Sequence, residues 1–185
     1  GVQYSENSVL GQGAGGSGVD NTYGFDGVDV SLPMFGNLAS EPSTHDIQSV
    51  SMERGGAKAI GFNRAGGFAM NTISKSGTNE FEGSLEYKFQ NKSFVSDVTS
   101  ADGAIPNELD KSWFSGNISG PIIEDELFFY ASYYRPEVDK ANKETVYGSV
   151  KDYHSVRDEF FGKLTYAPTL DLLLNASYRT SEREG

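Results

Sequence analysis

Apolar and polar residues alternate strictly over Phe81–Gln90, and this stretch sets the pattern for the second half of the chain. Its odd positions carry no charge, and its even positions are all polar. A period of two places the two sets on opposite faces of a β-strand. The sequence therefore predicts a strand with one face that avoids water and one that is hydrated.

The alternation recurs in four later segments, predicted as the strands Ser112–Ile122, Leu127–Tyr134, Glu159–Ala167 and Asp171–Thr180. The residues predicted to face outward in these strands are Phe114, Gly116, Ile118, Gly120, Ile122, Leu127, Phe129, Ala131, Tyr133, Phe160, Gly162, Leu164, Tyr166, Leu172, Leu174, Ala176 and Tyr178. None of them is charged. An Arg or Lys facing lipid at mid-depth costs about 2–4 kcal/mol, so strands that meet hydrocarbon are expected to show this segregation.

The connections between the predicted strands alternate in length. Ile123–Glu126 and Pro168–Leu170 are short, whereas Asn91–Lys111 and Arg135–Asp158 are long. Short turns on one side and long loops on the other are typical of outer-membrane barrels. Each strand also has an outward aromatic residue near its long-loop end, which predicts a lipid-facing girdle at the membrane interface. The predicted girdle residues are Phe89, Phe114, Tyr133, Phe160 and Tyr178.

A soluble β-sandwich is the alternative interpretation of these strands, because a second sheet could cover the same apolar face. Phe128 and Tyr130 make the opposite face of the third strand apolar as well. Contacts to a plug inside a barrel explain them, and a sandwich core explains them equally. The alternative function is then a secreted or surface module that binds a glycan or a protein, and solubility without detergent would distinguish it.

The first half of the chain is also predicted to be β-rich. Thr22–Val30 is a candidate hairpin, because Asp26-Gly27 is a strong two-residue turn signal between apolar arms. Asp46–Glu53 and Gly67–Lys75 are candidate strands, and Ala57–Ile60 is a candidate helical turn.

Charge and composition exclude several classes of protein. The formal net charge is −11, which argues against a general nucleic-acid binder. No run of about 18 apolar residues occurs, so the sequence has no candidate spanning helix. Gly13, Gly15 and Gly18 match a phosphate-loop spacing, but no buried strand precedes them and no helical pattern follows, which favours a flexible loop.

No catalytic or metal-binding constellation is evident, and neither enzymatic activity nor a cofactor is expected. Cysteine is absent, which excludes disulfides and thiolate metal sites. His45 and His154 lie far apart and outside any metal-ligand spacing. Ser115, His154 and Asp158 have the residue types of a triad but lack a nucleophile-elbow sequence.

Several longer segments resemble TonB-dependent outer-membrane receptors, most closely the Oar-like group. The resemblance rests on Asn21–Val30, on Gly66–Gly83, which contains Ser-Lys-Ser-Gly-Thr-Asn-Glu-Phe, on Gly120–Tyr133 and on Phe161–Pro168. In that family the first two segments lie in the C-terminal part of the plug and its exit into the first barrel strand.

The resemblance implies a mainly β fold, a fragment of a plugged transmembrane antiparallel β-barrel. Residues 1–76 would be the C-terminal part of the plug, 77–80 the linker, and 81–185 the first strands of an incomplete barrel. It further implies an outer-membrane location in a Gram-negative bacterium and the inner-membrane TonB complex as a partner, whose contact segment is expected to lie outside this chain. The cargo is a small molecule, saccharide or peptide that the sequence does not identify. Candidate structural residues of the plug are Asp26, Gly27, Glu53, Arg54, Gly55, Arg64, Gly66 and Gly67.

Overall fold

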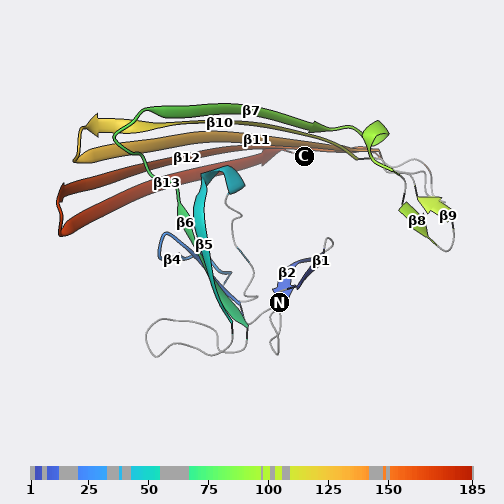
Figure 1. The fold of residues 1–185 in the computed structure, drawn as a ribbon. Helices are drawn as coiled ribbons and strands as arrows, with labels where there is room; N and C mark the ends of the chain where they lie inside the picture. Colours follow the sequence, from blue (N-terminus) through green and yellow to red (C-terminus); the bar gives the residue numbers. More distant parts are fainter. Residues whose placement is uncertain are drawn as a thin grey trace. The chain divides into compact units, whose positions relative to one another are not determined.

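The chain forms two compact units, Gly1–Lys75 and Ser76–Gly185. The structure is a computed structural model that describes every residue except 1–2, 6–7, 13–20, 33–37, 39–42, 55–66, 97, 101–102, 106–108, 142–147, 149–150 and 185. Both units are built from strands with short 3-10 turns (Figure 1). Among the described residues, no helix combines the length and the apolar character needed to cross a bilayer.

The first unit contains a mixed four-stranded sheet with the order β4-β3-β6-β5. Its strands are β3 (Thr22–Phe25), β4 (Val28–Asp29), β5 (Ile47–Arg54) and β6 (Phe68–Ser74). β3 pairs parallel to β6, and β5 pairs antiparallel to β6. The predicted hairpin and the two predicted strands are therefore confirmed.

Two further elements of this unit were not predicted. A hairpin of β1 (Gln3–Ser5) and β2 (Ser8–Gln12) precedes the sheet, and β2 ends directly before the glycines of the phosphate-loop spacing. The 3-10 turn η2 (Thr44–Asp46) leads into β5 and is capped by Ser43, whose hydroxyl accepts a hydrogen bond from the His45 amide at 3.3 Å. The glycines of the phosphate-loop spacing and the predicted helical turn at Ala57–Ile60 lie outside the described residues.

Asp26 and Gly27 form the turn between β3 and β4, as the sequence predicts. Both have positive φ angles, 48° and 84°, which the left-handed turns of two-residue hairpins require. The carboxylate of Asp26 also accepts hydrogen bonds from the Ser74 amide at 2.9 Å and from its hydroxyl at 2.5 Å. The turn residue thus joins the hairpin to the end of β6, a role that the sequence did not reveal.

We expect Asp26→Ala to destabilise this sheet by about 1–3 kcal/mol, because two partly buried hydrogen-bond donors on Ser74 lose their acceptor. Hydrogen exchange of the Ser74 amide should accelerate. Asp26→Asn keeps one acceptor oxygen in the same place and should lose less than half as much. An unchanged exchange rate in Asp26→Ala would contradict this role.

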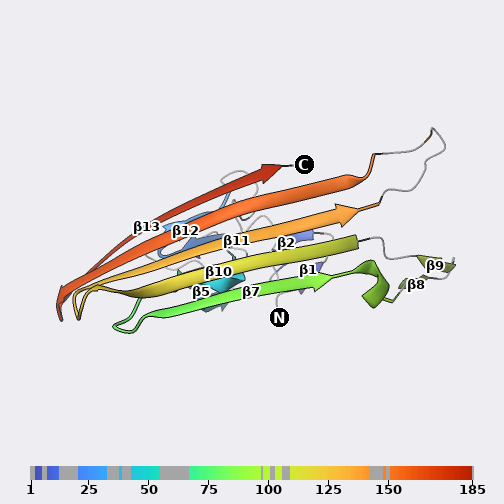
Figure 2. The ribbon, with the colours of Figure 1, turned by 90° about the horizontal axis from the view of Figure 1, so that it is seen from above.

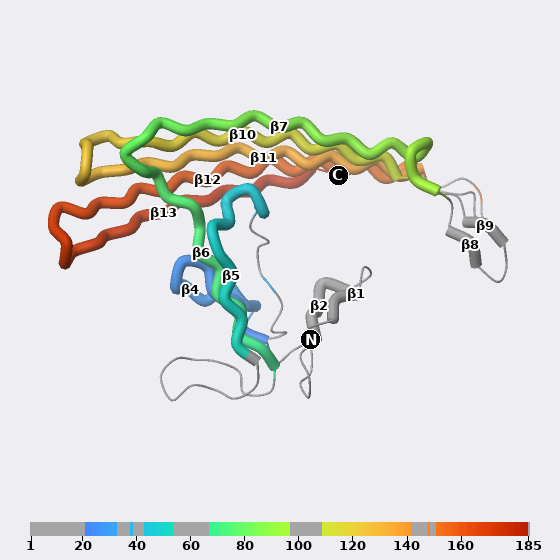
Figure 3. Tube along the Cα trace, in the orientation of Figure 1, coloured from blue at the N-terminus to red at the C-terminus, as the bar shows by residue number. Residues whose placement is uncertain are grey.

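The second unit is a five-stranded antiparallel sheet with the order β13-β12-β11-β10-β7. Its strands are β7 (Glu82–Gln90), β10 (Leu109–Ile123), β11 (Leu127–Lys140), β12 (Tyr153–Thr169) and β13 (Leu172–Glu184). The tube in Figure 3 and the view in Figure 2 show them side by side in chain order, an up-and-down meander. Between β7 and β10 lie η3 (Lys92–Phe94) and the small hairpin of β8 (Val98–Ser100) and β9 (Gly103–Ile105).

All five predicted strands are present, but the bounds predicted for the long loops are wrong. β11 continues to Lys140 and β12 begins at Tyr153, so half of the predicted loop Arg135–Asp158 is strand. β10 begins at Leu109, inside the predicted loop Asn91–Lys111. The apolar alternation ends before the strands do, because backbone pairing continues after the side chains have become charged.

The apolar face of this sheet is open, which contradicts the β-sandwich alternative. Leu85, Leu164 and Leu174 are 81%, 46% and 53% exposed. A sandwich would bury these leucines beneath a second sheet. Among the described residues of the second unit, no other sheet covers them.

Candidate functional site

The strand register places the predicted outward residues of all five strands on one face of the sheet. Directly opposite residues of antiparallel strands share a face. Phe114 is opposite Tyr87 on β7, and Tyr133 on β11 is opposite Phe160 on β12. Gly162 on β12 is in turn opposite Tyr178 on β13, so the apolar sets join across the whole sheet. We call this the outer face, and the opposite one the inner face.

The inner face is mainly polar and hydrogen-bonded between strands. Asn117 donates a hydrogen bond to Ser84 at 2.7 Å, and Thr165 donates one to Asn175 at 2.9 Å. Both pairs join neighbouring strands on the side away from the leucines. A surface of this kind is typical of the lumen side of an outer-membrane barrel.

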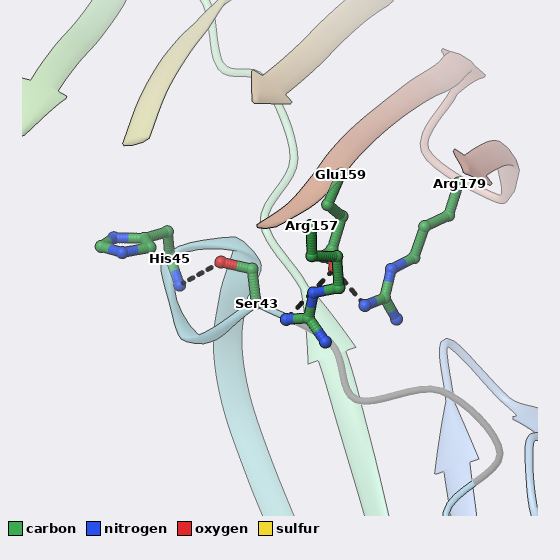
Figure 4. Close-up of polar contacts among 5 residues, drawn as sticks. All are labelled: Ser43, His45, Arg157, Glu159 and Arg179. Carbon is green, nitrogen blue, oxygen red and sulfur yellow. Dashed lines mark hydrogen bonds and ion pairs between the residues drawn. The ribbon is translucent and has the colours of Figure 1, made fainter. Parts of the chain in front are cut away.

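Glu159 is the most buried charged residue on the inner face, at 1% exposure, and two arginines neutralise it. One of its carboxylate oxygens lies 2.8 Å from Arg179 and the other lies 3.6 Å from Arg157 (Figure 4). The guanidinium of Arg157 also lies 6.0 Å from the centre of the Tyr134 ring. The three charges come from two adjacent strands and sum to +1, so removal of Glu159 would leave two cations close together. The contact between Ser43 and His45 in the same figure belongs to the first unit.

An aromatic pair on the inner face includes Tyr130, one of the two apolar inner-face positions of the third predicted strand. Tyr130 and Phe161 are both buried, and their ring centroids lie 6.1 Å apart. They sit on the neighbouring strands β11 and β12. The expectation that Phe128 and Tyr130 contact a plug stays a prediction.

The predicted girdle residues lie together on the outer face. The rings of Phe114 and Tyr133 are 6.1 Å apart, and Phe89 stacks on Tyr87 at 6.3 Å. The strands continue beyond this aromatic row toward the long loops. The first charged residues of the outer face come directly after the aromatic row. Arg135 lies 3.7 Å from Asp158, and the Tyr133 hydroxyl donates a hydrogen bond to Asp158. Their role at a membrane interface stays a prediction.

The predicted linker, residues 77–80, is held on the turn between β10 and β11. The Asn79 side-chain amide donates a hydrogen bond to the Asp125 carboxylate at 2.6 Å. The Asp125 backbone amide donates one back to the Asn79 side-chain oxygen at 2.8 Å. Asp125 has a φ angle of 63°, so this pair of hydrogen bonds stabilises a strained turn residue.

The candidate plug residues are not gathered into one site. Asp26 and Gly27 form a turn, Glu53 is exposed near the end of β5, and Gly67 is buried just before β6. Arg54 ends β5, and its side chain is outside the described part. The other candidates outside the described residues are Gly55, Arg64 and Gly66. Their structural roles in a plug stay predictions.

The residue types of a hydrolase triad are not brought together. Ser115 is buried on the inner face, whereas Asp158 and His154 occupy outer-face positions. His154 instead lies opposite Asp139, with 2.6 Å between its Nδ1 and the carboxylate. Glu137, Asp139 and His154 present potential metal-ligating atoms within 4.8 Å of one another. Sequence spacing could not reveal this group, because the pairing of β11 with β12 creates it.

Comparison with known proteins agrees with this geometry. Residues 73–152 match the family model described as an outer membrane beta barrel domain. The TonB-dependent transporter Oar of Myxococcus xanthus is 27% identical over 187 residues, an alignment that covers 82% of this chain and 17% of that protein. No solved structure matches the chain.

The match over residues 73–152 and the open two-faced sheet define the fold class: the second unit has the fold of an outer-membrane β-barrel domain, as a sheet that is not closed. Within that class, the resemblance to TonB-dependent receptors of the Oar-like group is confirmed. The chain is mainly β and is located in the outer membrane. It spans 17% of the length of the relative that it matches.

Proposed function

We propose that the chain is part of an outer-membrane TonB-dependent receptor that takes up an unidentified ligand through a plugged β-barrel. In this proposal residues 81–185 are barrel wall, 77–80 are the linker and 1–76 are the C-terminal part of the plug. The observation that carries it is the part of the outer face between the short turns and the aromatic row, which is free of charge across five strands in register and is exposed. Water-soluble monomers rarely expose an apolar patch that extends over so many strands.

The dimensions of the outer face support a membrane-spanning wall. From Phe81 to Phe89 the chain advances by eight residues. At about 3.4 Å per residue and a tilt of ~40°, this stretch covers roughly 21 Å along the membrane normal, close to the ~25 Å apolar band of outer-membrane barrels.

The edges of the sheet support a larger closed barrel. β7 and β13 are the edge strands of this sheet and each pairs with one neighbour. Unpaired backbone groups at a lipid-exposed edge cost several kcal/mol each, so both edges need further strands in a membrane. A barrel of about 22 strands, as in plugged outer-membrane transporters, would provide them.

The function of the plug and its energy source are inferred from the resemblance. The matched relative is named a TonB-dependent transporter. By this resemblance, an inner-membrane TonB complex would pull on the plug and admit cargo bound from outside. The lipid of the outer membrane would contact the outer face.

An uptake experiment tests the proposal. The complete gene product is expressed in a Gram-negative host, with TonB present or deleted, and mass spectrometry measures which solutes of a complex medium are depleted. We expect the protein in the outer-membrane fraction and at least one solute depleted only when both the protein and TonB are present. Depletion without TonB would indicate a passive channel, and recovery of the protein in the soluble fraction would indicate the binding module.

A further inference from the structure

Charged residues are sorted between the two faces near the long-loop ends of the strands. Four strands carry an acid next to a base in the sequence, at Asp110-Lys111, Asp139-Lys140, Arg157-Asp158 and Glu182-Arg183. Because consecutive strand residues point to opposite faces, each pair contributes one charge to each face. In all four pairs the register places the acid on the outer face and the base on the inner face.

Near the long-loop ends of the strands, the charged residues at the described inner-face positions are all basic. Trp113 is opposite Lys88 on one side and Pro136 on the other, and Arg157 is opposite Arg183. The inner-face strand positions from this row toward the loops are Lys88, Gln90, Leu109, Lys111, Trp113, Pro136, Val138, Lys140, Tyr153, Ser155, Arg157 and Arg183. These positions of the described strands include no carboxylate.

The outer face at the same level has the opposite charge. Its acidic residues are Asp110, Glu137, Asp139, Asp158, Glu182 and Glu184. Arg135 and His154 are its basic residues. The formal charge of the chain is −11, so a basic inner face does not follow from composition and reflects placement.

Two of the five inner-face bases have a carboxylate nearby, Lys88 with Glu86 at 3.0 Å and Arg157 with Glu159, and the other three have none within the described ranges. Arg157 and Arg183 are directly opposite, an arrangement of like charges that destabilises a sheet. Arg157 has Glu159 at 3.6 Å. Lys111, Lys140 and Arg183 form no ion pair with any residue in the described ranges. A bound anion would offset this repulsion, and a concave wall of one charge sign concentrates counter-ions.

We propose that the inner face at the long-loop end is a cation-lined vestibule wall and that the cargo is an anionic solute, one that carries carboxylate, phosphate or sulfonate groups. Trp113 and Tyr153 lie among the bases and offer ring faces to the apolar part of such a solute. This inference rests on the proposed function, because it assumes that the inner face lines a lumen.

The test is anion binding to the full-length protein in detergent. The probe is pyranine, a trisulfonated dye, followed by fluorescence anisotropy at low and high salt. The inner-face variant combines Lys111→Gln, Lys140→Gln and Arg183→Gln. The matched control combines Asp110→Asn, Glu182→Gln and Glu184→Gln, which alters nearby positions on the opposite face of two of the same strands.

We expect the inner-face variant to weaken pyranine binding on the order of tenfold at low salt, with a smaller difference at high salt, and the control to change it less than about twofold. Equal and opposite changes in the two variants would show that net charge alone matters, and would overturn the proposal. No loss in the inner-face variant would overturn it as well. Unchanged migration of the folded form in electrophoresis confirms folding, and Arg183→Gln alone, near a strand end, serves if the triple variant does not fold.

The outcome is separable from that of the uptake experiment. Pyranine binding requires neither TonB nor energy. Loss of binding in the inner-face variant together with TonB-independent uptake would retain the vestibule and reject the energised transporter. TonB-dependent uptake with unaltered pyranine binding would retain the transporter and reject the anionic cargo.

Discussion

Leu85→Arg is expected to destabilise the protein in a lipid bilayer by about 2–4 kcal/mol, the effect of an arginine that faces lipid near mid-depth. Leu85 lies in the middle of β7 on the outer face and is 81% exposed. In a soluble protein the same substitution at so exposed a position would change the free energy of unfolding by no more than about 0.5 kcal/mol. The magnitude therefore decides whether lipid or water meets this face.

The measurement is reversible unfolding by guanidinium of the full-length protein in lipid vesicles, with Ser84→Arg as the matched control. Ser84 is the preceding residue, is also exposed, and points to the inner face, where it accepts the hydrogen bond from Asn117. Loss of that bond should account for about 1 kcal/mol. If Leu85→Arg were no more destabilising than Ser84→Arg, the outer face would not be embedded in hydrocarbon.

The faces of the strands could be predicted from sequence because an apolar face requires every second residue of a strand to be uncharged. Leu164 and Leu174 lie ten residues apart on the neighbouring strands β12 and β13, and period two alone predicts that both face outward. Their exposure on one face agrees with that prediction. Turn chemistry was equally local, so the positive φ angles of Asp26 and Gly27 were expected from two residues.

Features that depend on strand register could not be predicted. Glu159 meets Arg179 over a sequence separation of 20 residues, and Asp139 meets His154 over 15. The strand registers that bring these residues together are fixed by the turns and by the whole apolar pattern. No short sequence motif therefore contains the pairs. The sorting of acids outward and bases inward was missed for the same reason, since a net charge of −11 hides it.

The predicted strand ends differ from the observed ones because apolar alternation and backbone pairing have different causes. Apolar alternation marks the uncharged band of the outer face, and on β11 it stops at Tyr133. Backbone hydrogen bonds then continue to Lys140, where side chains are charged. The strand segments beyond the predicted bounds therefore mark where the sheet extends past its apolar band.

Gly77→Ala is the second substitution for which we expect a large effect. A Cβ atom on Gly77 would lie 2.2 Å from the carbonyl oxygen of Phe129 and 2.9 Å from its backbone nitrogen and carbonyl carbon. Phe129 is paired on both sides, with Gly120 of β10 and Leu164 of β12, so its backbone cannot retreat. Overpacking of this kind costs about 1–3 kcal/mol, and a contact with fixed backbone atoms places it at the upper end.

Unfolding in lipid vesicles measures the effect, and Gly83→Ala is the matched control. At Gly83 the nearest atom to an added Cβ is the Asn117 carbonyl oxygen at 3.2 Å, which small adjustments accommodate, so a change within about 0.5 kcal/mol is expected. Asn79, two residues after Gly77, is hydrogen-bonded to the turn at Asp125, so the chain is fixed directly after the tight contact. A stable Gly77→Ala variant would show that the linker lifts off β11 in the full-length protein. A destabilised one would show that the chain is anchored to the wall from Gly77 onward, so that any movement of a plug must begin before that residue.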